Sequence, residues 1–142
     1  MQDGADTLTG GCHCGAIRYA MPRAVEHNAL CHCSDCRRHA GAPMVGWAMV
    51  AAEAVRITGT PATYHSSEHG RRQFCRDCGT GLFYRNAAVL PGMLDIQTGT
   101  LDDPDAMPPT AHIQTAERLG WMEEAHALPS FARFPGPPVT EP

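Results

Sequence analysis

Short stretches in which apolar and polar residues alternate, or in which apolar residues follow one another, recur along most of this chain. Such stretches, bounded by glycine, proline and other turn residues, are typical of β-strands. They predict strands over 16–20, 46–50, 55–58, 62–65, 72–74, 82–85, 93–98 and 112–114. The 14 glycines and 12 prolines among 142 residues also favour many short strands over long helices.

Helical periodicity occurs in two places. Residues 37–41 predict one or two helical turns, which Gly41 and Pro43 would end. In 118–127, apolar residues recur at helical spacing and continue to the end of the segment: Trp121, Met122, Ala125 and Leu128. We expect this short C-terminal helix to cover the sheet with its apolar stripe.

Many short strands with one terminal helix predict a mainly-β fold. We find no internal boundary, and a chain of 142 residues suits one domain, which we expect over 1–134. Residues 135–142 are rich in proline and have little to bury, so we expect a flexible C-terminal tail.

The charge of the chain limits its partners. A net charge of −4 argues against nucleic acid, because phosphate binding needs a clustered positive surface. The basic pairs Arg37-Arg38 and Arg71-Arg72 are adequate only for a small anion. All eleven basic residues are arginines, which excludes a lysine Schiff base with a carbonyl substrate.

The apolar content predicts the compartment. No stretch approaches the roughly 20 apolar residues of a membrane span, and residues 1–6 form no apolar signal sequence. We therefore expect a cytoplasmic protein without membrane contact. In a reducing cytosol, clustered cysteines more often bind metal or act in catalysis than form disulfides.

The seven cysteines lie in three tight groups: Cys12-x-Cys14, Cys31-x-Cys33-x-x-Cys36 and Cys75-x-x-Cys78. A Cys-x-x-Cys turn directs both sulfurs at one ion, and the Gly79 that follows suits the positive φ of such a turn. In Cys-x-Cys, residues i and i+2 of a strand point to the same side. The central three lie within six residues and form one local group, so the two outer pairs combine into a second group.

Four cysteine ligands form a closed tetrahedral zinc site, whose binding energy stabilises the fold. We predict a structural zinc ion on the two outer pairs, Cys12, Cys14, Cys75 and Cys78. One alternative partition keeps the first pair but joins it to Cys31 and Cys33. A rubredoxin-type iron site is a further alternative for the four-cysteine group.

The remaining group supplies only three ligands: Cys31, Cys33 and Cys36. Three protein ligands with water or substrate in fourth place are the pattern of catalytic zinc. The sequence therefore predicts two zinc ions per chain, one structural and one catalytic. Two alternatives stay open: His32, Asp35 or His39 could complete a second structural site, or the three cysteines could form a redox group.

Three motifs resemble those of the glutathione-dependent formaldehyde-activating enzyme family: Gly10-Gly11-Cys12-His13-Cys14-Gly15, Cys31-His32-Cys33-Ser34-Asp35-Cys36-Arg37 and Phe74-Cys75-Arg76-Asp77-Cys78-Gly79-Thr80. The resemblance extends in order over about residues 9–134. It implies a β-tent fold, in which several coiled β-sheets are held together by zinc. It also implies the same division of the cysteines between a structural and a catalytic ion.

The activity that this resemblance implies is that of a carbon–sulfur lyase. The family name refers to the reversible addition of formaldehyde to the thiol of glutathione, which gives S-hydroxymethylglutathione. We expect the substrate thiol to take the fourth zinc position, where the metal lowers its pKa and the sulfur attacks a carbonyl. The expected partners are thus a small thiol and an aldehyde, and the expected assembly is a monomer or homodimer.

Four further residues are candidates for the site. Asp35 and His39 could orient ligands or move a proton, although either could be a surface residue. Arg37 could meet a substrate carboxylate, and Trp47 could line the substrate pocket or belong to the core. Arg71 and Arg72 are interpreted mainly as ordinary strand residues, with anion binding as the alternative.

Two other functions remain in view. A zinc module without catalysis could bind a partner protein, in which case the second ion would have four protein ligands. A thiol reductase could use a cysteine of the central group as nucleophile, in which case that group would hold no metal.

Overall fold

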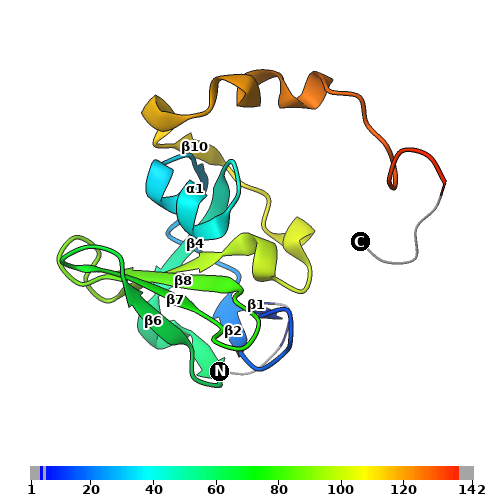
Figure 1. Ribbon diagram of the computed structural model, residues 1–142. Coiled ribbons are helices and arrows are strands. Elements are labelled where there is room, and N and C mark those ends of the chain that lie inside the picture. Colours follow the sequence, from blue (N-terminus) through cyan, green and yellow to red (C-terminus); the bar gives the residue numbers. More distant parts are fainter. Residues whose placement is uncertain (1–3, 5, 138–142) are drawn as a thin grey trace.

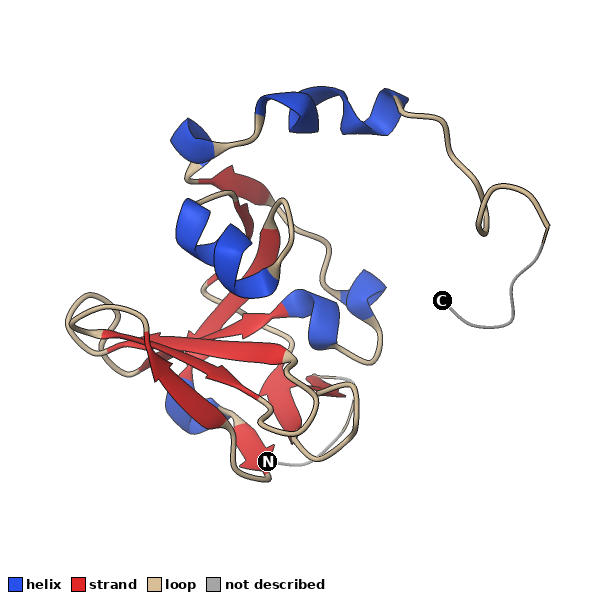
Figure 2. Ribbon diagram, viewed as in Figure 1, coloured by secondary structure: helices blue, strands red, loops and turns tan. Residues whose placement is uncertain are grey.

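The computed structural model describes Gly4 and residues 6–137, in which strands dominate (Figures 1 and 2). The strands within this part of the chain are β1 (Thr7–Gly11), β2 (Arg18–Pro22), β3 (His27–Cys31), β4 (Val45–Ala51), β5 (Arg56–Thr58), β6 (Ala62–His65), β7 (Gly70–Phe74), β8 (Gly81–Asn86), β9 (Met93–Gln97) and β10 (Ala111–Ile113). The helices are α1 (Ser34–Ala40) and the short 3₁₀-helices η1 (Ala52–Ala54), η2 (Thr98–Thr100), η3 (Pro104–Ala106), η4 (Thr115–Glu117) and η5 (Gly120–Ala127). The predicted mainly-β class is confirmed.

The strands form a small and a large sheet. The small sheet has the order β1-β2-β5, and all its pairs are antiparallel. The large sheet has the order β10-β3-β4-β9-β8-β7-β6, and its pairs are antiparallel except that β10 runs parallel to β3. Neighbours in sequence are mostly neighbours in space, but β9 lies between β4 and β8 and so joins the two halves of the large sheet.

The two faces of the large sheet bury different residues, because successive side chains on a strand point to opposite sides. One face carries the main core, with Ala48 and Val50 of β4 next to Leu94 and Ile96 of β9. These pack with residues of the small sheet such as Met21. The main core therefore lies between the two sheets.

The other face of the large sheet carries a second, smaller apolar cluster. It contains Cys31 of β3, Val45 and Trp47 of β4, and Cys36 of α1, with Tyr84 of β8 packed against them. Helix α1 lies over this face in Figure 1. Its C-terminus is closed by Gly41 in the left-handed conformation, with φ of 63°.

The predicted strands are confirmed, with ends that differ by a few residues. The sequence pattern did not identify 7–11 and 27–31 as strands, although β1 and β3 lie there. The predicted helical turns at 37–41 are present but begin earlier, at Ser34.

The expectation for 118–127 is wrong in one respect. The segment forms the 3₁₀-helix η5, and its apolar stripe does not cover a sheet, because Trp121 is 57% and Leu128 61% exposed. The orange segment in Figure 1 runs past α1 and away from both sheets.

Two further expectations concern the ends and the membrane. Most of the expected flexible tail, residues 138–142, lies outside the described residues, and the domain range 1–134 stays a prediction. Within the described part, no helix has the length and apolar character that a membrane crossing needs.

A polar cluster joins the small sheet to the segment that follows β9. Asp102 accepts hydrogen bonds from Arg18 Nη1 at 2.9 Å and from the Thr9 hydroxyl at 2.7 Å. Its backbone N–H donates to the Thr9 carbonyl at 2.9 Å. The pKa of Asp102 is lowered to about 2, chiefly by the hydrogen bond from Arg18 and then by that from Thr9.

The lowered pKa of Asp102 makes a pH-dependent contribution to stability. Its folded value of about 2 lies below the ordinary value of 3.8, so the stabilisation is full at neutral pH and is lost as the pH falls toward 2. Because both side chains of the ion pair are about half exposed (44% and 50%), water screens it. We expect Asp102→Asn to lower the free energy of unfolding by about 1 kcal/mol at pH 7.

Urea unfolding at pH 7 and pH 2.5 measures this difference, which should shrink at the lower pH. Asp103→Asn, which changes the neighbouring exposed carboxylate, is the control and should leave stability unchanged. Equal stability of Asp102→Asn and the parent at pH 7 would contradict the assignment.

Candidate metal centre

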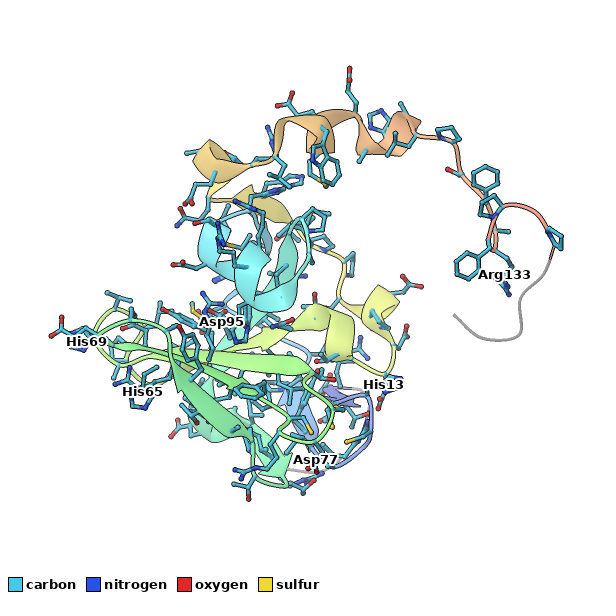
Figure 3. All side chains as sticks on the ribbon, in the orientation of Figure 1. His13, His65, His69, Asp77, Asp95 and Arg133 are labelled. Atoms are coloured by element: carbon cyan, nitrogen blue, oxygen red, sulfur yellow. The ribbon has the colours of Figure 1, made fainter. Side chains whose placement is uncertain are left out.

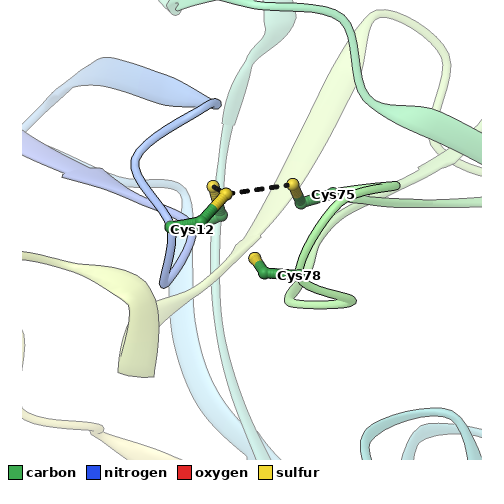
Figure 4. A group of neighbouring side chains, drawn as sticks. Cys12, Cys75 and Cys78 are labelled. Carbon is green, nitrogen blue, oxygen red and sulfur yellow. Dashed lines mark hydrogen bonds between the residues drawn. The ribbon is translucent and has the colours of Figure 1, made fainter.

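The first cysteine group joins the ends of two strands from different sheets. Cys12 and Cys14 follow β1, and Cys75 and Cys78 follow β7. Figure 4 shows the sulfurs of Cys12, Cys75 and Cys78 directed at one another. All four sulfurs lie within 4.8 Å of one another, with 3.7 Å between Cys12 and Cys14 and 3.8 Å between Cys14 and Cys75.

These distances fit a zinc ion. Four sulfurs at the usual Zn–S distance of about 2.3 Å form a tetrahedron with edges of about 3.8 Å. A disulfide would bring two sulfurs to about 2.05 Å, and all seven cysteines of the chain are free. The four-cysteine group can therefore hold a metal ion, and its donor set and spacing are compatible with zinc.

Local backbone turns aim these sulfurs. Gly15 and Gly79 have φ of 85° and 82°, and their N–H groups donate to the carbonyls of Cys12 and Cys75. The glycines that follow each cysteine pair thus close the two turns, as the spacing predicts. The pKa of Cys78 is lowered to about 5, chiefly by the hydrogen bond between its sulfur and the Thr80 hydroxyl.

The second group is built at the junction of β3 and α1. Cys31 is the last residue of β3, Cys33 is the N-cap of α1, and Cys36 lies in the first turn of the helix. The Cys33 sulfur accepts a hydrogen bond from the Cys36 N–H at 3.3 Å, which is how a side chain caps a helix. The three sulfurs lie within 4.8 Å of one another, whereas the structure does not bring Cys12 and Cys14 into this group.

A fourth protein ligand does not join the three cysteines. Among the described residues, no histidine or carboxylate lies within 4.8 Å of all three sulfurs. The ring of His32 is buried and its Nε2 lies 2.9 Å from Nδ1 of His112, with which it shares a hydrogen bond. Asp35 is exposed, and His39 stacks on Tyr64 with 6.1 Å between the rings.

A buried arginine contacts this group. Both terminal nitrogens of Arg72 lie 3.8 Å from the Cys36 sulfur, and its guanidinium lies over the Tyr84 ring at 5.0 Å. The pKa of Cys36 is lowered to about 5, chiefly by the hydrogen bond from Cys31, and also by that from Cys33 and by the charge of Arg72, against the effect of burial. The interpretation of Arg72 as an ordinary strand residue missed this contact.

The three cysteines open on a cavity of about 280 Å³. Trp47 and Tyr84 line it with apolar surface. Trp47 also belongs to the smaller buried cluster, so it both lines the cavity and forms part of the core. Asp35 lies at the same cavity. His39 and Arg37 line two other cavities, of about 410 and 400 Å³.

Asp95 of β9 is a residue of this cavity that the sequence analysis missed (Figure 3). Burial raises its pKa to about 6, against the opposing effect of His27, whose Nε2 lies 3.8 Å from Oδ1 of Asp95. The same oxygen is buried and has no hydrogen-bond partner. The signal in the sequence was an acidic residue between Leu94 and Ile96, in the middle of an apolar strand.

The sequence of this chain is similar to that of a known protein family. The sequence model of the family described as glutathione-dependent formaldehyde-activating enzyme matches residues 7–117, which include all seven cysteines. The chain belongs to this family. The family match agrees with the resemblance noted in the cysteine motifs.

Individual relatives from this family have low sequence identity to the chain. A Halomonas elongata protein, provisionally named a glutathione-dependent formaldehyde-activating enzyme, is 26% identical over 155 residues, covering 94% of this chain and 92% of that protein. A Phaeosphaeria nodorum protein with the same provisional name is 28% identical over 139 residues, covering 92% of this chain but only 64% of that protein. The chain thus spans less than two thirds of that relative's length.

A solved structure supports the fold. The crystal structure of a Rhodobacter sphaeroides protein aligns with a TM-score of 0.56 at 22% identity, over 74% of this chain and 99% of that chain. At this identity the likeness concerns the fold alone.

The two cysteine groups should respond differently to loss of one sulfur. We expect Cys78→Ser to give insoluble or unfolded protein, because the four-cysteine group joins strands from both sheets and its binding energy stabilises the fold. We expect Cys33→Ser to remain folded and to hold one metal ion fewer. Metal analysis and circular dichroism of the purified proteins measure both effects, and soluble, fully metallated Cys78→Ser protein would contradict this division.

Arg72 should strengthen metal retention by the three-cysteine group. Arg72→Gln removes the positive charge beside the Cys36 sulfur, so we expect the affinity of this group for zinc to fall roughly 10- to 100-fold. Competition with a coloured chelator measures the affinity.

Arg71→Gln is the matched control for this experiment. Arg71 is the adjacent residue on β7, and its guanidinium donates to the backbone carbonyls of Ser67, Glu68 and Gly70 instead. Equal zinc affinities of the Arg71 and Arg72 variants would show that the contact with Cys36 has no effect on the metal.

Proposed function

We propose that the chain is a zinc-dependent carbon–sulfur lyase. In this proposal it catalyses the reversible addition of a glutathione-like thiol to formaldehyde or a related small carbonyl compound. Two zinc ions serve each chain: a structural ion on Cys12, Cys14, Cys75 and Cys78, and a catalytic ion on Cys31, Cys33 and Cys36.

The observation that carries the proposal is the incomplete donor set beside a cavity. Three cysteine thiols converge, and no histidine, carboxylate or fourth cysteine joins them among the described residues. They open on a cavity of about 280 Å³. Catalytic zinc sites have this form, with three protein ligands and one exchangeable position. Zinc bound there supplies a positive charge that lowers the pKa of a coordinating thiol.

The residues of the cavity have separate tasks. Trp47 and Tyr84 provide an apolar wall that excludes water, which strengthens the electrostatic interactions inside. Arg72 offsets the negative charge that three thiolates place around a divalent ion. Asp35, at the rim of the cavity, orients the incoming substrate.

The chemistry of the carbonyl partner follows from what the chain lacks. With no lysine in its sequence, the protein forms no lysine Schiff base, so the thiol sulfur adds to the carbonyl carbon directly. The names of the relatives support glutathione and formaldehyde as the pair. Holding both reactants in one cavity raises their effective concentration.

Exchange spectroscopy with ¹³C-formaldehyde and glutathione tests the proposal. We expect the zinc-loaded protein to raise the rate of interconversion between hydrated formaldehyde and the thiol adduct at least about tenfold above the uncatalysed background, a lowering of the barrier by about 1.4 kcal/mol.

The control separates catalysis from the presence of zinc. Cys33→Ser, which retains the four-cysteine group, should show only the background rate. A wild-type rate equal to the background, together with X-ray absorption showing four protein ligands at both metal ions, would favour a non-catalytic zinc module that binds a partner.

A further inference from the structure

The geometry points to Asp95 as the catalytic residue that accepts the proton of the substrate thiol and delivers it to the carbonyl oxygen. This inference rests on the proposed function, because it assigns a role within that reaction.

The register of the large sheet places Asp95 on the same face as the three-cysteine group. Directly paired residues of neighbouring strands point to the same side. Asp95 pairs with Met49 of β4 and with Tyr84 of β8, while His27 pairs with Met49 and Arg72 with Tyr84. One row across five strands therefore carries His27, Asp95, Tyr84 and Arg72 side by side, and each of these four lines the cavity of the cysteines.

The carboxylate of Asp95 is costly to keep at this position. Its side chain is only 11% exposed, and among the described residues its buried Oδ1 has no hydrogen-bond partner, although His27 Nε2 lies 3.8 Å away. Buried polar groups are normally paired, and an unpaired buried acid is strongly disfavoured in its charged form. An acid that can take up a proton here relieves this cost, so the position favours proton uptake.

Asp95 differs from three other polar groups of the cavity. The guanidinium of Arg72 carries only N–H donors and has no acceptor. The Tyr84 hydroxyl already accepts a hydrogen bond from Asn86 Nδ2 at 3.1 Å. Asp35 is exposed, whereas Asp95 is buried.

The proton balance of the reaction requires one such group. As the sulfur–carbon bond forms, the carbonyl π pair moves onto oxygen, and the thiol proton must leave sulfur. Asp95 takes this proton and gives it to the new alkoxide, which yields the neutral adduct and restores the carboxylate. The reverse path uses the same steps, and no oxidant or further reactant is needed.

The charge environment suits this role. Burial raises the pKa of Asp95 to about 6, so most of the group is a carboxylate at pH 7 and can accept a proton. A thiolate bound nearby adds a negative charge and raises that pKa further. Asp95 therefore keeps the proton until the alkoxide oxygen of the adduct forms and accepts it. The titratable and charged groups that line the cavity around Asp95 are His27 and Cys31 of β3, Cys33, Asp35 and Cys36 at α1, Tyr84 of β8 and Arg72 of β7.

Counting protons during thiol binding tests the role of Asp95 without relying on turnover. The heat of binding is measured as glutathione is titrated into zinc-loaded protein at pH 7.0, in two buffers of different ionisation enthalpy. The difference between the two heats gives the number of protons released. A thiol with pKa near 8.5 must lose about one proton on binding as a thiolate. We expect the wild type to release close to zero protons, because Asp95 takes the proton, and Asp95→Asn to release about one.

Matched variants complete the experiment. Asp105→Asn changes an exposed carboxylate of η3 and should behave as the wild type. Asp95→Glu keeps an acid and should restore part of the proton uptake. Zinc content and circular dichroism establish that each variant is folded and loaded. In the exchange assay, Asp95→Asn should lower kcat about 10²- to 10⁴-fold with little change in KM.

The outcomes separate the two proposals. If glutathione binds and both wild type and Asp95→Asn release one proton, Asp95 is not the acceptor, although the proposed function stands. If Asp95→Asn does not fold, the wild type is compared with Asp95→Glu. Release of about one proton by each of these two proteins would overturn the role of Asp95 in the same way. If the wild type binds no thiol and gives no exchange above background, the proposed function falls and the role of Asp95 falls with it.

Discussion

The convergence of four sulfurs between the two sheets is the constraint on which the rest of the structure depends. Cys14 and Cys75 are 61 residues apart, yet their sulfurs lie 3.8 Å from each other. Four thiolates at such distances repel one another unless a cation lies among them, and a cation binds strongly only to deprotonated sulfur. A metal ion held by these sulfurs would fix the end of β1 in the small sheet against the end of β7 in the large sheet. The second site gains from this fixation, because β7 also carries Arg72, and the position of Arg72 relative to Cys36 depends on how β7 is held.

Local sequence features were sufficient to predict the parts of the molecule that are formed by residues close together in the sequence. Alternating residues located most strands, and the spacing of the cysteines within each group indicated which sulfurs could share an ion. The contact of Arg72 with Cys36 and the position of Asp95 were missed because both depend on pairing between β7, β8 and β9, which no short window of sequence contains. A charged residue within an apolar strand, such as Asp95 between Leu94 and Ile96, was the one local signal, and it does not reveal which groups lie opposite.

The C-terminal segment illustrates a different limit. The periodic apolar residues of 118–127 correctly indicated a short helical segment, but periodicity does not tell whether an apolar surface is free to receive it. The outer face of the large sheet already carries α1, whose Cys36 is buried there in a cluster with Cys31 and Trp47. Trp121 of the C-terminal segment remains 57% exposed.

The division of the large sheet into two faces explains how stability and chemistry coexist in a small protein. The inner face contributes apolar core, whereas the outer face collects groups that are costly to bury, among them Arg72 and Asp95. Three thiolates around a divalent ion leave one negative charge, and the guanidinium of Arg72 is placed to offset it. Burial raises the pKa of Asp95 to about 6, against the opposing effect of His27 at 3.8 Å. An additional thiolate in the cavity would upset this balance by one charge, and protonation of Asp95 is the change within the cavity that restores it without moving the backbone.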